Sequence, residues 1–124
     1  MKTIDTSLAP AAIGPYSQAK SHGDLLFVSG QIPLDPTSGQ VVEGGIREQT
    51  IQVIKNLSAI LEAGGTGFHG VIKTSCFLSD MAHFTEFNAL YEQYFISNPA
   101  RSCLAARELP KGVLVEIEAI AVLK

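Results

Sequence analysis

The chain has 124 residues, the size of one average domain and too few for two, so we expect a single domain over residues 1–124. Hydrophobic residues make up 46% and charged residues only 17%, which predicts an apolar surface that is buried in an oligomer. The net charge of −3 and the scattered Lys and Arg residues argue against nucleic acid as a partner. Because there is neither a membrane span nor a basic, apolar leader, we expect a soluble, cytoplasmic protein.

The first 45 residues indicate short strands and loops. We expect strands over Lys2–Thr6, Tyr16–His22 and Leu25–Ser29, with the last two joined as a hairpin by the Gly23-Asp24 turn. Residues 30–44 contain two prolines and three glycines, a composition that predicts an ordered loop.

Two helices and a strand are indicated in the middle of the chain. Apolar residues recur at helical spacing over Ile46–Glu62, and Gly64-Gly65 ends that run. The apolar, partly β-branched segment Val71–Leu78 predicts a strand. Asp80 is then expected to cap a second helix, whose apolar stripe ends before Asn98-Pro99. We interpret that stripe as core: Phe84, Phe87, Leu90, Tyr91, Tyr94 and Phe95.

The C-terminal segment alternates with a period of two from Val113 to Leu123, the pattern of a strand with one apolar face. The predicted order is strands, helix, strand, helix, strands. This order predicts an α/β (α+β) fold with a mixed sheet and both helices packed on one face.

The cysteines and histidines show no ligand spacing. Cys76 and Cys103 lack a CxxC or His-rich partner, so we expect two free thiols and neither a disulfide nor a zinc site. His22, His69 and His83 are far apart in sequence and are expected to be solvated.

Arg101 is the most informative charged residue. It follows Asn98-Pro99-Ala100 in a stretch of small and apolar residues, where a lone arginine entering a strand needs a partner. Its planar guanidinium suits bidentate binding of a ligand carboxylate. An ion pair with Glu116 or Glu118 across the sheet explains the residue equally well.

Glu116 and Glu118 lie on one face of the last strand, about 6.6 Å apart, so only one of them can stand at the mouth of a given pocket. A buried acid requires a partner or a function. From these residues alone, either glutamate is a candidate.

Five segments in fixed order give the chain a resemblance to the RidA/YjgF family of reactive-intermediate deaminases, almost from end to end. They are Gly14-Pro15-Tyr16-Ser17-Gln18, Val28-Ser29-Gly30-Gln31-Ile32-Pro33, Asn88 with Tyr91 and Phe95, Pro99-Ala100-Arg101-Ser102-Cys103, and Val115 to Ala121. The sequence departs from the family pattern at Leu104-Ala105-Ala106-Arg107-Glu108-Leu109, where an arginine is moved by one place and trimer packing is expected to differ.

The resemblance implies a chorismate-mutase-like fold, a homotrimer with a cleft at each subunit interface, and hydrolysis of 2-iminobutanoate and 2-iminopropanoate to 2-keto acids without metal or cofactor. It implies that Arg101 binds the substrate carboxylate and that Glu116, not Glu118, positions the attacking water. It further implies that main-chain groups of Gly30 and Cys103 hold the ligand and that Tyr16 and Ser29 line the cleft. Asn88 is interpreted as part of the interface.

A thiol nucleophile at Cys103 is not expected, because no histidine is placed beside it. Two other classes of function stay open. One is a regulatory or binding module, such as a translation inhibitor with ribonuclease activity or a chaperone. The acidic net charge argues against RNA as the ligand of such a module. The other is a trimeric ligand sensor that uses the same cleft.

Overall fold

The computed structural model describes residues 1–123. Six strands and two α-helices follow one another in the order that the sequence predicts. The strands are β1 (Lys2–Ile4), β2 (Ala19–His22), β3 (Leu25–Gln31), β4 (Val71–Leu78), β5 (Ala100–Ala105) and β6 (Val115–Val122), and the helices are α1 (Ile46–Gly64) and α2 (Phe84–Tyr94). No helix within these residues is long and apolar enough to cross a membrane.

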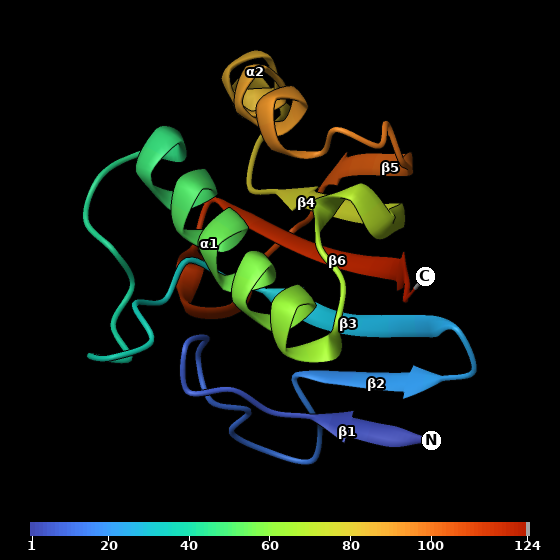
Figure 1. Cartoon of the computed structure of the whole chain (residues 1–124). Coiled ribbons are helices and arrows are strands. Elements are labelled where there is room, and N and C mark those ends of the chain that lie inside the picture. The colour runs from blue at the N-terminus through green and yellow to red at the C-terminus, as the bar shows by residue number, and fades with distance from the viewer. Residues whose placement is uncertain (124) are drawn as a thin grey trace.

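All six strands form one mixed sheet in the order β1-β2-β3-β6-β4-β5. Only β4 and β5 pair in parallel, because α2 carries the chain back over the sheet between them. Both helices lie on the same face: α1 runs along the middle of the sheet and α2 covers the end formed by β4 and β5 (Figure 1). The predicted mixed sheet with two helices on one face is confirmed.

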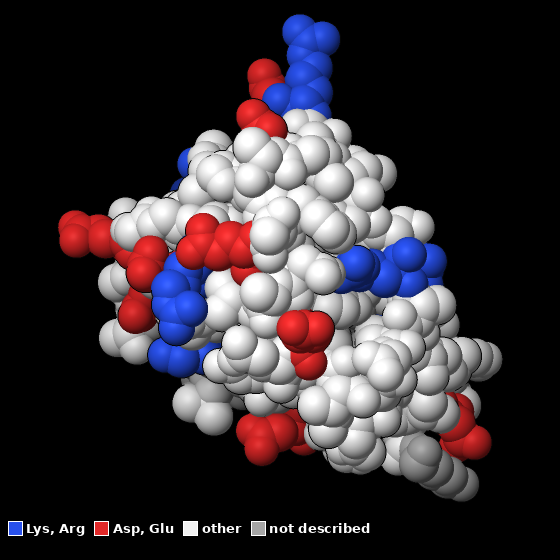
Figure 2. All heavy atoms as spheres, turned by 90° about the horizontal axis from the view of Figure 1, so that it is seen from above, with Lys and Arg blue, Asp and Glu red and all other residues white. Residues whose placement is uncertain are grey.

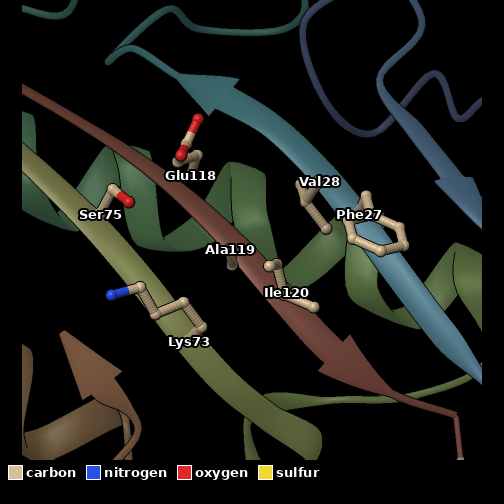
Figure 3. A pocket seen from close by; sticks show the side chains of 7 residues that line it. All are labelled: Phe27, Val28, Lys73, Ser75, Glu118, Ala119 and Ile120. Carbon is tan, nitrogen blue, oxygen red and sulfur yellow. The ribbon is translucent and has the colours of Figure 1, made fainter.

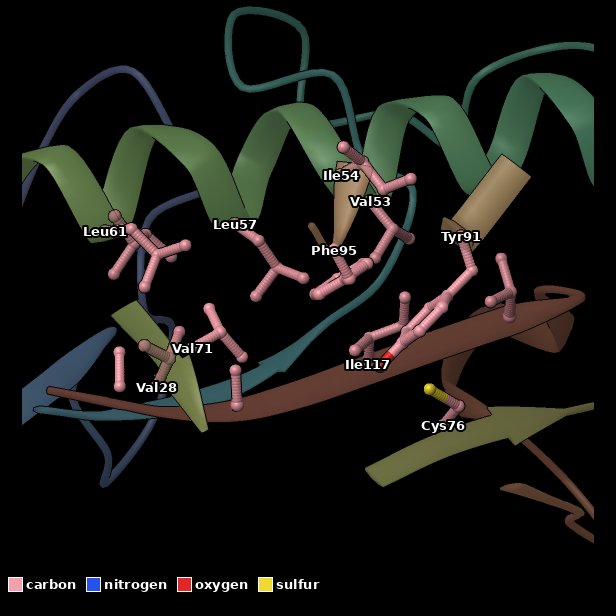
Figure 4. Close-up of a cluster of buried hydrophobic side chains, with 14 of the residues drawn as sticks. Val28, Val53, Ile54, Leu57, Leu61, Val71, Cys76, Tyr91, Phe95 and Ile117 are labelled. Carbon is pink, nitrogen blue, oxygen red and sulfur yellow. The ribbon is translucent and has the colours of Figure 1, made fainter. Parts of the chain in front are cut away.

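The core fills the space between α1 and the sheet, where Tyr91 and Phe95 pack among the apolar side chains (Figure 4). On β6, alternate residues point into this layer, as the period of two predicts. The largest side chains that are fully buried include Phe87, Phe95, Leu26, Leu57, Ile60, Leu61, Leu78 and Ile117. Four residues of the stripe are buried, as interpreted from the sequence: Phe87, Leu90, Tyr91 and Phe95. Phe84 is only partly buried, and Tyr94 remains 38% exposed.

Neither of the two α-helices within residues 1–123 lies on the other face of the sheet. We call it the open face and define it by the side chains of Phe27, Lys73, Ser75, Phe77, Leu104, Glu116, Glu118 and Ile120. Phe27 is 44% exposed and Leu104 is 48% exposed. The face therefore presents apolar side chains to its surroundings, with a few charged groups among them.

Several element boundaries differ from the sequence predictions. The first two strands are shorter than expected, and β3 continues to Gln31. Asp80 does act as an N-cap, since its Oδ1 accepts a hydrogen bond from the Ala82 N–H at 2.8 Å. It caps a 3₁₀ turn over Met81–His83, however, and α2 itself begins only at Phe84.

Candidate functional site

Arg101 lies on β5, at the edge of the sheet, and points to the helix-covered side. Its partner in the neighbouring strand β4 is Thr74, which is fully buried under α2. The Arg101 Nη1 donates a hydrogen bond to Asn88 Oδ1 at 2.7 Å. Its guanidinium carbon stands 4.6 Å from the centroid of the Tyr91 ring and 5.6 Å from that of Phe84, which is cation–π distance for both rings.

The Tyr91 ring is itself held in place. Its hydroxyl and that of Thr74 are 2.7 Å apart in a buried hydrogen bond, and the ring stacks on Phe95 at 4.1 Å between centroids. The guanidinium thus rests on a fixed surface and not on a mobile side chain. A pocket of about 390 Å³ opens beside it, lined by Asn88, Tyr91, Glu92, Phe95, Asn98, Pro99 and Arg101.

Cys103 lies two residues along β5 from Arg101, on the same side of the sheet, and pairs in register with Cys76. Both cysteines are free. Burial raises the pKa of the Cys103 thiol, and it raises that of Cys76 to about 12. Both thiols are therefore protonated at neutral pH, which argues against a thiolate nucleophile.

Glu116 lies on β6 and belongs to the open face. Its carboxyl group is packed against Gly30: a Cβ atom built on Gly30 would overlap Glu116 Oε2 and lie 3.0 Å from Glu116 Cδ. Burial raises the pKa of the Glu116 carboxyl above its usual range, and the charge of the neighbouring Glu118 raises it further. Glu118 is exposed and shows no such proximity to Gly30.

A β-bulge brings Gly30 to Glu116. The pairing of β3 with β6 shifts by one residue between Val28 and Gln31, so Ser29 and Gly30 occupy the irregular step. Ser29 is fixed there, because its hydroxyl donates to the Ser17 carbonyl at 2.6 Å. The strand expected to stop at Ser29 therefore continues through the bulge.

Tyr16 lies in the loop before β2 and is 54% exposed. It lines a small pocket of about 60 Å³ together with Gly30, Gln18 and others. The buried side-chain amide of Gln18 stabilises the preceding chain, because it forms hydrogen bonds with main-chain groups of Thr6, Ala9 and Pro10. Gly30 thus connects two contacts, since it lines this pocket with Tyr16 and also packs against the Glu116 carboxyl.

Arg101 and Glu116 do not meet within one chain. Glu116 is aligned with Phe77 and, through it, with Leu104, three residues beyond Arg101. Two strand spacings and three residues separate the two Cα atoms by roughly 14 Å, and the side chains leave opposite faces of the sheet. The ion pair between Arg101 and a sheet glutamate, considered from the sequence, is therefore wrong.

Sequence reasoning missed the surroundings of Arg101. Asn88, interpreted as part of an interface, accepts the arginine's hydrogen bond, and Tyr91 and Phe84, interpreted only as core, also contact the guanidinium. The signal was the i, i+3 spacing of Asn88 and Tyr91, which places both on one side of a helix. Within residues 1–123, no group of three or more His, Cys, Asp and Glu residues could hold a metal ion.

The open face also holds a hollow of about 240 Å³ lined by Phe27, Val28, Lys73, Ser75, Glu118, Ala119 and Ile120 (Figure 3). It includes Glu118 but neither Glu116 nor Arg101. On the face shown in Figure 2, acidic and basic side chains are interspersed with broad uncharged areas and form no continuous basic patch.

The comparisons with known proteins cover nearly the whole chain. Residues 6–123 match the family model described as Endoribonuclease L-PSP. The human 2-iminobutanoate/2-iminopropanoate deaminase is 48% identical over 98% of this chain and 89% of its own length. A candidate regulator of Lactococcus lactis, AldR, is 52% identical over 100% of this chain and 99% of its own.

The fold comparison agrees. The crystal structure of the YjgF gene product of E. coli covers 100% of both chains at 43% identity, with a TM-score of 0.93. The match of residues 6–123 to the family model and the agreement of the whole fold point to one family. This chain accordingly belongs to the Endoribonuclease L-PSP family, that of the RidA/YjgF proteins.

Proposed function

We propose that this protein hydrolyses reactive 2-imino acids, such as 2-iminobutanoate and 2-iminopropanoate, to 2-keto acids and ammonia. The observation that carries the proposal is the Arg101 guanidinium, which lines an open pocket with an uncharged hydrogen-bond acceptor and two aromatic rings as its partners. A half-buried cation of this kind is suited to a ligand carboxylate. The near-full-length identity with a deaminase supports the same reaction.

The active site is proposed to lie between two copies of the chain. Arg101 and Cys103 belong to the helix-covered side of the sheet, whereas Glu116 belongs to the open face and packs against Gly30, next to Ser29 and in the pocket that Tyr16 lines. A single substrate, a few ångströms long, cannot touch both groups within one protomer. A neighbouring copy whose open face meets this edge would bring Arg101 of one chain to Glu116 of another.

A homotrimer is the proposed assembly. The contact joins two different surfaces, the α2 and β5 edge of one copy and the open face of the next, so it is heterologous and needs a closed ring. Three copies close such a ring and cover the exposed apolar side chains Phe27 and Leu104.

The proposed reaction starts from the protonated imine, which is already electrophilic. Arg101 fixes the substrate carboxylate and thereby the position of the imine carbon. Glu116 takes a proton from water as the water oxygen bonds to that carbon and the C=N π electrons pass to nitrogen. The same carboxyl returns the proton to nitrogen, after which the C–N bond breaks and ammonia leaves. The hydroxyl proton passes through the Glu116 carboxylate to this ammonia, giving ketone and ammonium.

The environment of Glu116 suits this role. Its raised pKa makes its carboxylate a stronger base than an ordinary glutamate and its acid form a better match for the amine that it reprotonates. Main-chain groups of Gly30 and Cys103 are proposed to hold the remainder of the ligand, with Ser29 and Tyr16 lining the cleft. Neither metal nor cofactor is required by these steps.

The test is a coupled assay in which a dehydratase generates the imine and keto-acid formation is followed with and without this protein. We expect a rate above that of spontaneous hydrolysis. A second candidate, a ligand sensor, follows from the identity with a candidate regulator and uses the same pocket. Saturable binding of a 2-keto acid without any rate increase would favour the sensor and exclude the deaminase.

A further inference from the structure

The guanidinium of Arg101 is held by three groups, none of which carries a charge. Asn88 Oδ1 accepts one N–H in the plane of the group, at 2.7 Å. The rings of Tyr91 and Phe84 contact it at 4.6 and 5.6 Å. We call these three residues the uncharged cradle.

The chemistry of the acceptor at position 88 matters for what Arg101 can bind. Aspartate has nearly the same shape as asparagine and would form a stronger, charge-assisted hydrogen bond with the guanidinium. It would also neutralise the positive charge that a ligand carboxylate requires. An amide oxygen fixes the orientation of the arginine without that cost to binding, and leaves four of the five N–H donors for other partners.

The Tyr91 ring of the cradle is fixed by buried contacts. Tyr91 is 7% exposed, its hydroxyl is bonded to that of the buried Thr74, and its ring stacks on Phe95. Asn88 lies three residues before Tyr91 on α2, so both contact the arginine from the same helix. Helix α2 thus orients the Arg101 guanidinium in two ways: Asn88 binds one of its N–H groups, and the Tyr91 ring packs against it.

We propose that Asn88 is a positioning residue, which orients the Arg101 guanidinium through an uncharged hydrogen bond and so keeps its full charge for the carboxylate of the substrate. This inference rests on the proposed binding of a carboxylate by Arg101. It assigns Asn88 no contact with the reacting atoms.

The test compares Asn88→Ala with Asn88→Asp. The probe is 2-oxobutanoate, a stable 2-keto acid, with its Kd measured by titration calorimetry. Alanine removes the hydrogen bond, and we expect Kd to rise about tenfold. Aspartate restores an acceptor but adds a competing charge, and we expect a larger rise, about a hundredfold. In the coupled assay both changes should raise KM much more than they lower kcat.

Gln93→Glu is the matched control. It makes the same change of charge on α2, five residues further along and on an exposed position outside the pocket. We expect its Kd and KM to stay within about twofold of the wild type, because solvent screens an exposed charge. Melting temperature identifies any loss of fold, and Asn88→Asp should melt no lower than the wild type, since its new ion pair is half-buried.

The two possible roles of Asn88 predict opposite orders of Kd for Asn88→Ala and Asn88→Asp. If it only holds the local structure together, aspartate should restore binding to the wild-type level, and that result would overturn the inference. Absence of 2-oxobutanoate binding to the wild type would overturn it as well. A wild type that binds the probe but hydrolyses no imine would contradict the proposed reaction alone, because the order of the three Kd values still tests Asn88.

Discussion

Glu116 and Glu118 are two residues apart on one strand, yet their surroundings differ. Glu116 packs against Gly30 and has a raised pKa, whereas Glu118 is exposed. Replacing Glu116 by Gln keeps the shape and removes the base, so we expect turnover to fall by about a hundredfold or more with little change in Kd for 2-oxobutanoate. Glu118→Gln is the control and should retain most of the activity at neutral pH. Equal losses in the two variants would show that the wrong acid has been assigned.

The pH dependence of the rate follows from the same carboxyl group. A base acts only when deprotonated, so kcat should fall with decreasing pH through the pKa of Glu116, which lies above the ordinary value of 4.5. Glu118→Gln removes the charge that helps to raise this pKa and should move the acid limb to lower pH. A pH profile measured on both proteins checks the shift. If the acid limb does not move, the fall in kcat at low pH is not caused by the titration of Glu116.

Stability should respond to pH with a defined sign. Because the folded-state pKa of Glu116 is raised, the native state holds its proton more firmly than the unfolded chain does. Its contribution to stability is therefore lost as pH rises from about 4.5 through the raised pKa. At neutral pH, Glu116→Gln should melt at or above the wild-type temperature, and the difference should vanish below pH 4. A lower melting temperature at neutral pH would contradict this account of the group.

The residues themselves predicted Arg101 as a site residue, whereas the choice of Glu116 over Glu118 came from the resemblance. Neither showed that the two side chains leave opposite faces of the sheet. Counting from Arg101 cannot show that β4 separates it from β6, because strand order depends on long-range pairing. The uncharged partners of Arg101 could not be predicted from the sequence either, because they also depend on long-range packing. Tyr91 and Phe84 form part of an apolar stripe that reads as core in a sequence, and only the packing of β5 against α2 shows their second contact.

At the level of elements, the regular parts of the fold were predictable from local patterns. Val71–Leu78 has the predicted bounds, and α1 begins at Ile46 as expected. It ends at a glycine signal: Gly65 adopts a φ of 93°, and its N–H bonds the Glu62 carbonyl. The bulge at Ser29-Gly30 was not predictable, because it depends on how β3 meets β6.

Gly30 offers a test of that bulge. A methyl group at this position would meet the Glu116 carboxyl, the mobile end of a flexible side chain. Gly30→Ala should therefore displace the carboxylate, lowering turnover at least tenfold, with a modest change in stability of about 1 kcal/mol or less. Gly45→Ala makes the same change in open space and should leave turnover unaffected. Wild-type turnover of Gly30→Ala would show that the close packing of Gly30 on Glu116 is dispensable.

The whole molecule was predicted to be oligomeric from its low charge and high apolar content, and we propose that the exposed apolar side chains of the open face lie in the contact between copies. Light scattering should report a mass of three chains. Replacing Leu104, 48% exposed in the single chain, by Asp should shift the mass toward one chain and abolish turnover, because a charge would be buried without a partner. A concentration-independent monomer of the wild type would exclude the shared site.

Complementation between two inactive variants tests the shared site most directly. Arg101→Ala leaves the substrate carboxylate without its partner, and Glu116→Gln removes the base, so each homotrimer should be inactive. When the two chains are unfolded, mixed in equal amounts and reassembled, every mixed trimer contains one interface with both residues intact. Random assembly then restores about a quarter of wild-type turnover. A mixture that stays as inactive as its components, although mass analysis shows mixed trimers, would contradict a site built from Arg101 of one chain and Glu116 of another.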